Sequence, residues 1–449
     1  MNQNTGHINT EQSPGEQSSS ESAQNGHAGS EHSHSEYSHS ELARIVENAV
    51  AQVPVYDIHT HLYDPAFGDL LLYGIDDLLV YHYLVSESFR FLEISYDAFW
   101  AMSKNEQADL IWNELFVRHS PISEACRGVL TTLNKLGLDV NKRDLPALRQ
   151  WFSKWSKEDY TAHCMELANV HTICMTNSPF DEQERPVWEK GFNRNSGFTS
   201  ALRIDPLLIQ WEQTVPQLQG WGYDVSVELT PKTLDEVRRF LGDWSQKMNA
   251  LYVMVSLSAD FVYPANTSTA QLIEKAVLPF CRESGLPFSP MLGVKRAVNP
   301  HLRLAGDGVG KSDIRLLETM AAQFPDTKFL VTMLSRENQH ELCVVARKFR
   351  NVHIFGCWWF TNIPQLIDEM TRMRLELLGL SVTPQHSDAR VLDQIIYKWD
   401  HSRQIIGQVL VDKYRDVAVT GWQPTRQEIE RDVRDLFGGA FETFLKARF

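Results

Sequence analysis

The chain has 449 residues, 43% of them hydrophobic, and a formal net charge of −14. Such a chain can bury a large core, its acidic balance argues against a nucleic-acid surface, and no apolar run approaches the roughly 18 residues that a membrane span requires. The N-terminus has no basic start and no hydrophobic segment, and the six cysteines form no Cys-x-x-Cys pair, so we expect no signal peptide and a cytoplasmic protein with reduced thiols.

Residues 1–40 are rich in Ser, Glu, Gly, Asn and His and hold almost no large apolar side chains. Because such a segment cannot bury enough surface to offset its ordering entropy, we expect a disordered N-terminal tail. Its histidines could bind a metal loosely, although a solvated tail is the favoured interpretation; they are His7, His27, His32, His34 and His39. The folded domain is expected to span residues 41–449 and to begin with a short helix from Glu41 through Val50.

From residue 53 onwards, apolar β-branched runs alternate with helical patterns, which indicates βαβ units and a parallel sheet. Eight such units predict an α/β fold of the (β/α)8 TIM-barrel type. The predicted strands are Val53–Ile58, His171–Thr176, Thr199–Ile204, Leu251–Leu257, Pro287–Val294, Lys328–Leu334, Val352–Trp358 and Leu380–Pro384.

One spacing between predicted strands departs from the regular barrel. The stretch from about residue 70 to 167 is helix-like and rich in aromatic residues, with no good strand. We interpret it as a helical insertion between the first and second strands, whose aromatic side chains pack against one another.

The run Asp57-Ile58-His59-Thr60-His61 ends the first predicted strand. Residues i and i+2 of a strand point to the same face, so both imidazoles are expected to face one site. Two neutral imidazoles at this spacing suit a borderline metal such as zinc. The spacing alone is not diagnostic, because His32-Ser33-His34 repeats it inside the polar tail.

A matching carboxylate follows the eighth predicted strand, in His386-Ser387-Asp388-Ala389-Arg390. In a closed barrel the eighth strand pairs with the first, and their C-terminal ends lie on the rim where barrel active sites occur. Asp388 is therefore a candidate third ligand in an open, catalytic metal site, although it could instead cap the next helix. His386 could point into the same site, but a hydrogen-bonded loop histidine is the favoured interpretation.

Four segments of the chain resemble the uronate (glucuronate) isomerase family, within the metal-dependent amidohydrolase superfamily. The Asp57–His61 run resembles the family's Asp-x-His-x-His-Leu segment, and Thr176-Asn177-Ser178-Pro179 resembles its Thr-Asp-Asp-Pro turn. Phe355–Asn362 resembles its Trp-Trp-Phe-Asn segment, and Ser387–Arg390 resembles its Thr-Asp-Ser-Arg. The resemblance covers about residues 53–413, and the last two segments, in order and correctly spaced, are the most specific.

The resemblance implies one divalent metal, expected to be zinc, with His59, His61 and Asp388 as ligands. Asp388 and Tyr83 are the expected acid–base groups. The expected substrate-binding residues are Arg390, Arg203, Arg336, Trp358 and Trp359. Each arginine could alternatively be a surface or salt-bridge residue, but three at strand ends suit an anionic sugar acid, because a guanidinium holds a carboxylate with two hydrogen bonds.

The chain also departs from the family pattern. Met291 stands where the family has a histidine at the end of the fifth strand, and Asp260-Phe261 stands where it has an Asp-His pair. Three protein ligands must then suffice, or the chemistry differs. The fourth predicted strand has no lysine, so the bridging lysine of two-metal amidohydrolases is missing and a single metal is expected.

The favoured function is aldose–ketose isomerisation of a hexuronate, of the glucuronate-to-fructuronate type, by a cytoplasmic homo-oligomer that binds neither nucleic acid nor membrane. Fold analogy leaves two alternatives open. One is a metal-dependent hydrolase of the same superfamily, and the other is a barrel that binds sugar acids without converting them.

Overall fold

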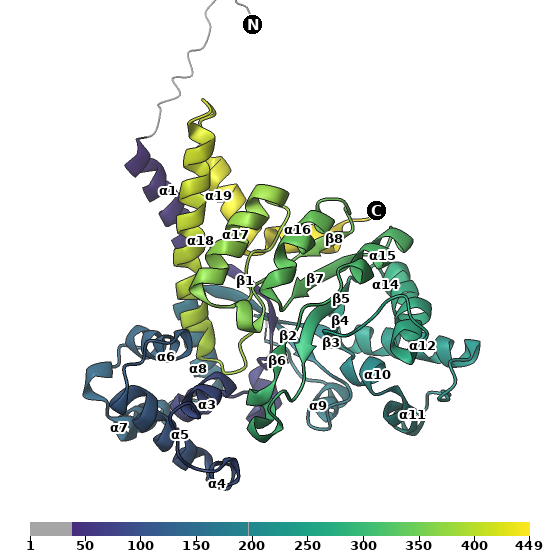
Figure 1. Ribbon diagram of the computed structural model, residues 1–449, viewed down its shortest axis with the longest axis horizontal. Helices are drawn as coiled ribbons and strands as arrows, with labels where there is room; N and C mark the ends of the chain where they lie inside the picture. Colours follow the sequence, from purple (N-terminus) through teal and green to yellow (C-terminus); the bar gives the residue numbers. More distant parts are fainter. Residues whose placement is uncertain (1–37, 196) are drawn as a thin grey trace, which may run out of the picture. The chain divides into compact units, whose positions relative to one another are not determined.

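The computed structural model describes residues 38–195 and 197–449, and one sheet of parallel strands lies at its centre (Figure 1). The hydrogen-bonded order is β1-β2-β3-β4-β5-β7-β8, and β6 pairs with β5 in antiparallel orientation. The strands are β1 (Val55–Thr60), β2 (Val170–Asn177), β3 (Phe198–Arg203), β4 (Ala250–Ser258), β5 (Phe288–Lys295), β6 (Gly308–Val309), β7 (Phe329–Met333) and β8 (Val352–Ile354). This curled parallel sheet with its helices confirms the prediction of a TIM-type barrel.

In space, a segment without regular strand structure lies between β8 and β1 and hydrogen-bonds to the chain on both sides. Thr383 forms an isolated parallel β-bridge with Phe355, and the Thr383 N–H donates to Ile354 O (3.1 Å). At the other side, the His61 N–H donates to Ala389 O (2.7 Å) and the Asp388 N–H to His59 O (3.2 Å).

The prediction of a regular eighth strand over Leu380–Pro384 is therefore wrong. Pro384 has no N–H to donate to a ladder. Its carbonyl and that of Gly356 instead accept hydrogen bonds from the buried Arg374 guanidinium, at 3.3 and 2.8 Å. The Arg374 side chain thus links the stretches at Gly356 and Pro384, where a regular strand pair would use backbone hydrogen bonds.

Seven α-helices and three short 3-10 or π-helical segments, all within the described residues, separate β1 from β2, which confirms the helical insertion. The α-helices are α2 (Ile75–Leu79), α3 (His82–Ser88), α4 (Tyr96–Trp100), α5 (Lys104–Trp112), α6 (Glu124–Lys135), α7 (Leu145–Phe152) and α8 (Lys157–Ala168). The predicted tail of residues 1–40 lies outside the described residues as far as residue 37. The first helix, α1 (His39–Gln52), begins before Glu41, because Ser38 caps it by accepting a hydrogen bond from the Glu41 N–H (3.2 Å).

The remaining helices lie along the chain after β2. They are α9 (Glu184–Lys190), α10 (Asp205–Ile209), α11 (Trp211–Gly220), α12 (Pro231–Met248), α13 (Ser268–Leu272), α14 (Leu278–Ser284), α15 (Arg315–Gln323), α16 (Gln339–Ala346), α17 (Pro364–Leu378), α18 (Gln394–Ala418), α19 (Arg426–Arg434) and α20 (Ala440–Lys446). Among the residues that the structure describes, no helix combines the length and the hydropathy of a membrane span.

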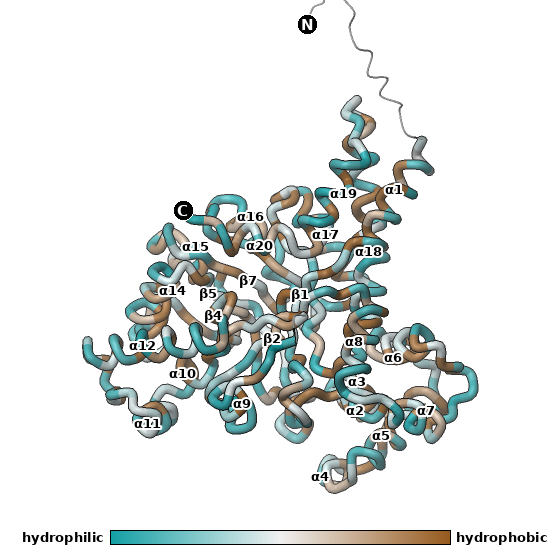
Figure 2. Tube along the Cα trace, turned by 180° about the vertical axis from the view of Figure 1, so that it is seen from behind, coloured by the Kyte–Doolittle hydropathy of each residue, from teal (hydrophilic) through white to brown (hydrophobic). Residues whose placement is uncertain are grey.

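Helix α12 illustrates why these segments are helical. Thr230 caps its N-terminus, Pro231 occupies the first turn, and Asn249 ends it in the left-handed conformation. Val237 and Leu241 recur at helical spacing on its buried face. Figure 2 shows the result along the chain, where helices change between apolar and polar colouring.

The barrel interior forms a separate apolar cluster, apart from the core between sheet and helices. It includes Met291, so the position where the family resemblance expects a histidine is packed with apolar neighbours. Phe441 of α20 contacts the rings of Tyr56 and Tyr252 edge-on, with centroids 5.6 and 6.3 Å apart. The C-terminal helix therefore contributes to the barrel core beside the N-terminal half of β1.

Candidate active site

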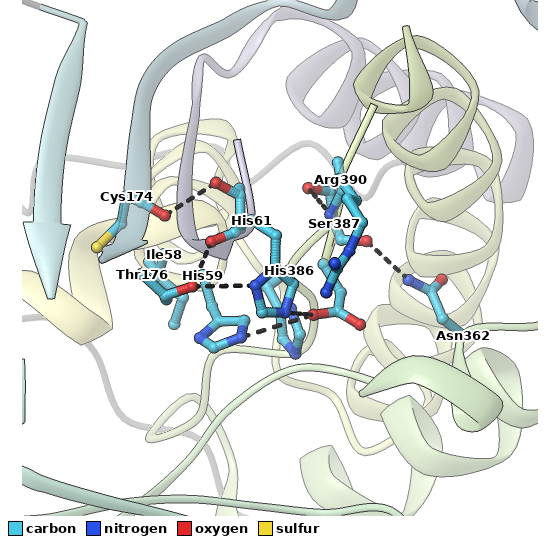
Figure 3. Close-up of polar contacts among 12 residues, drawn as sticks. Ile58, His59, His61, Cys174, Thr176, Asn362, His386, Ser387 and Arg390 are labelled. Atoms are coloured by element: carbon cyan, nitrogen blue, oxygen red, sulfur yellow. Dashed lines mark hydrogen bonds and ion pairs between the residues drawn. The ribbon is translucent and has the colours of Figure 1, made fainter. Parts of the chain in front are cut away.

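His59 in β1 and His61 directly after it lie close to a carboxylate from the segment between β8 and β1 (Figure 3). The Nε2 atoms of His59 and His61 each lie 3.5 Å from Oδ1 of Asp388. The three side chains offer ligand atoms within 4.8 Å of one another. We call His59, His61 and Asp388 the metal cluster. The structure thus brings together the three side chains that the sequence proposed as ligands.

The Nδ1 atoms of both histidines face hydroxyl groups of other strands. His59 Nδ1 lies 3.2 Å from the Tyr252 hydroxyl in β4, and His61 Nδ1 lies 3.3 Å from Oγ1 of Thr176 in β2. Each ring is therefore held at its Nδ1 edge, and its Nε2 edge is turned toward Asp388.

The electrostatics of the metal cluster fit a cation. Burial lowers the pKa of His59 to about 3, helped by the nearby Arg203 charge, and lowers that of His61 well below its usual range. Burial also raises the pKa of Asp388 to about 6. At neutral pH two imidazole lone pairs and a carboxylate oxygen converge, and His59 Nε2 and Asp388 Oδ1 are buried with no hydrogen-bond partner. Buried orphan atoms are unfavourable, and this nitrogen–oxygen donor set suits a divalent metal.

Asp57, the first residue of the run, is not a member of the metal cluster, but its contacts hold the segment that carries Asp388. Its carboxylate accepts hydrogen bonds from the Ser387 N–H and from Trp399 Nε1, both at 2.9 Å. Lys398 Nζ donates to the carbonyl of the same Ser387 (2.6 Å). Ser387, the residue just before Asp388, is thus bound through both its N–H and its carbonyl. Asp388 itself adopts a left-handed φ of 51°, which aspartate tolerates better than most residues.

Two adjoining pockets open at the metal cluster, and both are lined by His61, Arg203 and Arg390. The smaller pocket, of about 50 Å³, also contains Asp388. The larger pocket, of about 560 Å³, lies beside residues that follow β1, β2 and β3. A polar ligand in these pockets would lie against both the metal cluster and the two guanidinium groups.

The two arginines differ in their partners. Arg203 makes a two-pronged contact with Asp205, at 3.0 and 3.1 Å. Arg390 has no ion pair among the described residues, and its Nε is buried without a hydrogen-bond partner. Only its backbone N–H is engaged, with the Gln394 side chain (2.9 Å). Arg390 therefore presents to the pocket a guanidinium that makes no ion pair, near enough to the Asp388 carboxylate to favour its charged form.

The third predicted arginine lies elsewhere. Arg336 pairs with Glu369 at 2.9 Å, and 57% of its side chain is exposed. It lines neither pocket at the metal cluster. The structure therefore does not bring Arg336 to the site. Its guanidinium instead forms an ion pair with a surface carboxylate of α17.

The aromatic candidates divide between the pocket wall and the layer behind it. Trp358 and Trp359 line the smaller pocket, together with Tyr81 and His82. Tyr83 packs edge-on against Tyr81, with ring centroids 4.9 Å apart, and its hydroxyl is buried without a hydrogen-bond partner. Burial, with the charges of neighbouring groups, raises the pKa of Tyr83 well above its usual range, so the phenol is protonated at neutral pH.

The His386 ring meets that of His59 edge-on and does not join the metal cluster. Its ring centroid lies 5.0 Å from that of His59, and neither ring nitrogen has a hydrogen-bond partner. The expected hydrogen-bonded loop histidine is therefore not what the structure shows. Gly356 makes room for the ring, because a Cβ at that position would lie 1.7 Å from His386 Cδ2.

Sequence reasoning did not identify Tyr252, Arg296 or the positioning role of Asp57. Tyr252 lies within an apolar strand and looks like any core aromatic residue. Arg296 follows β5 and lines the smaller pocket, paired with Asp307. The aspartate of the Asp-x-His-x-His run was the one visible signal, since a buried carboxylate next to two ligands needs partners of its own.

Solved structures similar to this chain cover nearly all of its length. A uronate isomerase from Bacillus halodurans C-125 matches with 52% sequence identity and a TM-score of 0.90, over 91% of this chain and 97% of that one. A uronate isomerase from Thermotoga maritima (14% identity) and a glucuronate isomerase from Caulobacter crescentus (15%) both give a TM-score of 0.72. They cover 90% and 92% of this chain and 97% and 95% of their own, and at such identities they show the fold alone. Comparisons with protein-family models and with curated proteins find no match.

Proposed function

The chain belongs to the uronate isomerase family and is an isomerase, and from that premise we propose that it interconverts a hexuronate and its keto form, of the glucuronate–fructuronate type. We further propose that it does so with a single divalent metal, Zn²⁺, held by His59, His61 and Asp388. The site is predicted to be complete with these three protein ligands, despite Met291.

One observation carries this proposal. Arg390, whose guanidinium makes no ion pair among the described residues, lines the same small pocket as His61 and Asp388 of the metal cluster. A hexuronate carries a carbonyl at one end and a carboxylate at the other, which matches this pair of features. Arg203, although shared with Asp205, adds positive charge between them.

The residues divide the chemistry between them. A divalent cation bound at the metal cluster supplies a Lewis acid that polarises the oxygens on the two reacting carbons. Arg390 binds the distal carboxylate and so determines which carbon faces the metal cluster. Trp358 and Trp359 cover the pocket and restrict water.

From aldose to ketose, one proton must move from C2 to C1 and another from the C2 oxygen to the C1 oxygen, so no external oxidant or reductant is required. Asp388 is the proposed base, because its carboxylate lines the pocket beside His61 and Arg390. Tyr83 is the proposed proton donor, acting through the neighbouring Tyr81 that lines the pocket, and its phenol stays protonated at neutral pH. Tyr81 lies at the pocket wall between the two and offers a second hydroxyl.

The two alternative functions predict different behaviour. A hydrolase would favour an apolar pocket with a spare base, whereas this pocket is lined by several arginines. A non-catalytic barrel would bind a uronate without forming ketose.

The activity test is incubation of the full chain, loaded with Zn²⁺, with glucuronate and separately with galacturonate, followed by NMR. We expect the aldose signals to be replaced by those of the ketose, and we expect Asp388→Asn to abolish this conversion. Binding of a uronate with no ketose formed would overturn the proposal in favour of the non-catalytic barrel.

The metal proposal has its own test. Elemental analysis of the dialysed full chain should find one metal ion per chain, and His59→Ala should lose it. Both proteins carry the same histidine-rich residues 1–40, so the difference between them reports the metal cluster alone. Equal metal content in the two proteins would contradict the assignment.

A further inference from the structure

The hydroxyl groups of Tyr252 and Thr176 lie behind the metal cluster and make the same kind of contact with its two histidines. We propose that these hydroxyls are positioning groups that fix His59 and His61 as Nδ1–H tautomers, so that both Nε2 lone pairs face the bound cation. The inference rests on the proposed metal centre and goes beyond it, because neither residue is a ligand.

For His59 the tautomer follows from counting protons. The Tyr252 hydroxyl lies 2.9 Å from the carbonyl oxygen of Ile58 and 3.2 Å from His59 Nδ1. A carbonyl can only accept, so the single hydroxyl proton goes to Ile58. The contact with His59 is then a hydrogen bond only if Nδ1 carries a proton and donates it to the tyrosine oxygen. His59 Nε2 is left as a lone pair, and it faces Asp388.

For His61 the same count applies with a different hydroxyl (Figure 3). Thr176 Oγ1 donates its one proton to the carbonyl of Thr60 at 2.8 Å. His61 Nδ1, at 3.3 Å from the same oxygen, must therefore be the donor in that contact. Its Nε2 is also left as a lone pair directed at Asp388.

The two hydrogen-bond chains, one from His59 and one from His61, have the same arrangement. In each, the proton chain starts at the histidine and ends at the backbone carbonyl of the residue just before it, Ile58 for His59 and Thr60 for His61. The hydroxyl between them comes from another strand, β4 in one case and β2 in the other. Both carbonyls belong to β1, so the strand that carries the histidines also determines their tautomers.

The opposite tautomers would place an Nε2–H against the cation and two lone pairs against each other at Nδ1. Removing an outer group that orients a metal-bound histidine typically lowers metal affinity by about 10–100-fold. Within that range, the loss of metal affinity should differ between removal of the Tyr252 hydroxyl behind His59 and removal of the Thr176 hydroxyl behind His61. The His59 side chain is 1% exposed, whereas that of His61 is 21% exposed. Water can replace the Thr176 hydroxyl but not the Tyr252 hydroxyl.

The test measures Zn²⁺ affinity of the full chain by competition with a chromophoric chelator. We expect Tyr252→Phe to weaken binding by about 100-fold and Thr176→Val by about 10-fold, with Thr176→Ser close to wild type because it keeps the hydroxyl. Tyr56→Phe is the matched control for the tyrosine, since its hydroxyl bonds Thr199 (3.2 Å) within the same barrel. Thr161→Val is the control for the threonine, since its hydroxyl bonds a carbonyl within α8.

A second readout reports the tautomer itself. In proteins with ¹⁵N-labelled histidine rings, the metal-free wild type should show the Nδ1–H pattern for both residues. Tyr252→Phe should change His59 alone, and Thr176→Val should change His61 alone. If Tyr252→Phe does not fold, the Thr176 series decides the proposal by itself.

The outcomes separate this inference from the proposed metal centre. If His59→Ala binds Zn²⁺ as tightly as wild type, the metal centre is wrong. If His59→Ala loses the metal while Tyr252→Phe and Thr176→Val bind it as their controls do, the metal centre stands and the positioning role is overturned.

Discussion

On one side of the pocket, the metal cluster is held by groups that are buried and bonded in several directions. On the other side, the loop that includes the 3-10 turn Pro300–Gly306 reaches the helical insertion through contacts that are mostly exposed. The first side consists of β1 and the segment through Asp388, where Asp57, Lys398 and Trp399 surround the Ser387 peptide. The second side contributes Leu304 and Asp307 to the smaller pocket.

Several contacts among the described residues connect the loop to the insertion, and three of them involve Trp100 or His301. Trp100 Nε1 donates to the carbonyl of His301 (2.8 Å), and the Arg303 guanidinium lies 4.4 Å over the Trp100 ring. Tyr96 stacks on His301 with ring centroids 5.4 Å apart. Leu304 is 59% exposed. Buried, multiply bonded groups determine geometry and stability, whereas exposed contacts of this kind are worth little to stability and act on ligand access.

The largest effect should come from the buried side. Asp57→Asn leaves the Ser387 or Trp399 N–H without an acceptor and removes the charge that faces Lys398, so we expect the free energy of unfolding to fall by about 3–5 kcal/mol. Asp400→Asn, on the same helix as Lys398 but paired with Lys135 near the surface, should change it by less than about 1 kcal/mol. Urea unfolding of both variants measures the difference. Equal midpoints would mean that Asp57 does not hold the segment in place.

The next effect should appear in catalysis without a change in stability. Arg390→Met removes a guanidinium that makes no ion pair among the described residues, so the fold should lose little stability while the substrate loses a charge-assisted hydrogen bond. That bond is worth roughly 1.5–3 kcal/mol, which lowers kcat/KM on uronates by about ten- to 150-fold. Arg390→Lys should rescue only partly, because an ammonium cannot make a two-pronged contact.

Arg336→Met is the matched comparison, because its guanidinium is engaged by Glu369. We expect kcat/KM of this variant to stay near wild type. If Arg390→Met instead processes uronates normally, the carboxylate is held elsewhere and Arg203 becomes the candidate. A large drop in Tm for Arg390→Met would make the residue structural.

The exposed side should respond more weakly. Trp100→Phe removes the indole N–H that holds the His301 carbonyl, a loss of roughly 0.5–1 kcal/mol. We expect a small change in Tm but a several-fold rise in KM, because the loop carries Leu304 into the pocket. Trp422→Phe, at an exposed site in the turn between α18 and α19, should change neither. A KM unchanged by Trp100→Phe would show that the loop does not affect access.

The smallest effect should come from removing the polar residues 1–37. A chain that starts at Ser38 should keep its Tm and activity, because residues 1–37 are too polar to contribute a core. A chain that starts at Glu41 should lose roughly 0.5–2 kcal/mol, because the Ser38 cap of α1 is gone. A drop of more than a few degrees for the longer chain would show that the N-terminal residues dock on the barrel.

Much of the fold could be predicted because strand and helix patterns are local. Seven of the eight predicted strands lie within a few residues of β1, β2, β3, β4, β5, β7 and β8. The prediction of the eighth strand failed at Pro384, which has no N–H for a strand ladder. The Pro384 carbonyl instead accepts a hydrogen bond from Arg374, a residue in α17 that no strand pattern reveals.

The sequence by itself determined that His59 and His61 share a face, because alternation along a strand depends only on the backbone. Ring closure then brought Asp388 into reach, because the last stretch of a barrel must lie beside the first. Tertiary structure alone decided the rest: that Arg336 meets Glu369 while Arg390 stays unpaired, and that Tyr252 and Thr176 stand behind the histidines. These choices depend on which side chains from distant elements come within about 3–4 Å of each other, the range of a hydrogen bond or ion pair. No periodicity in the chain encodes that distance.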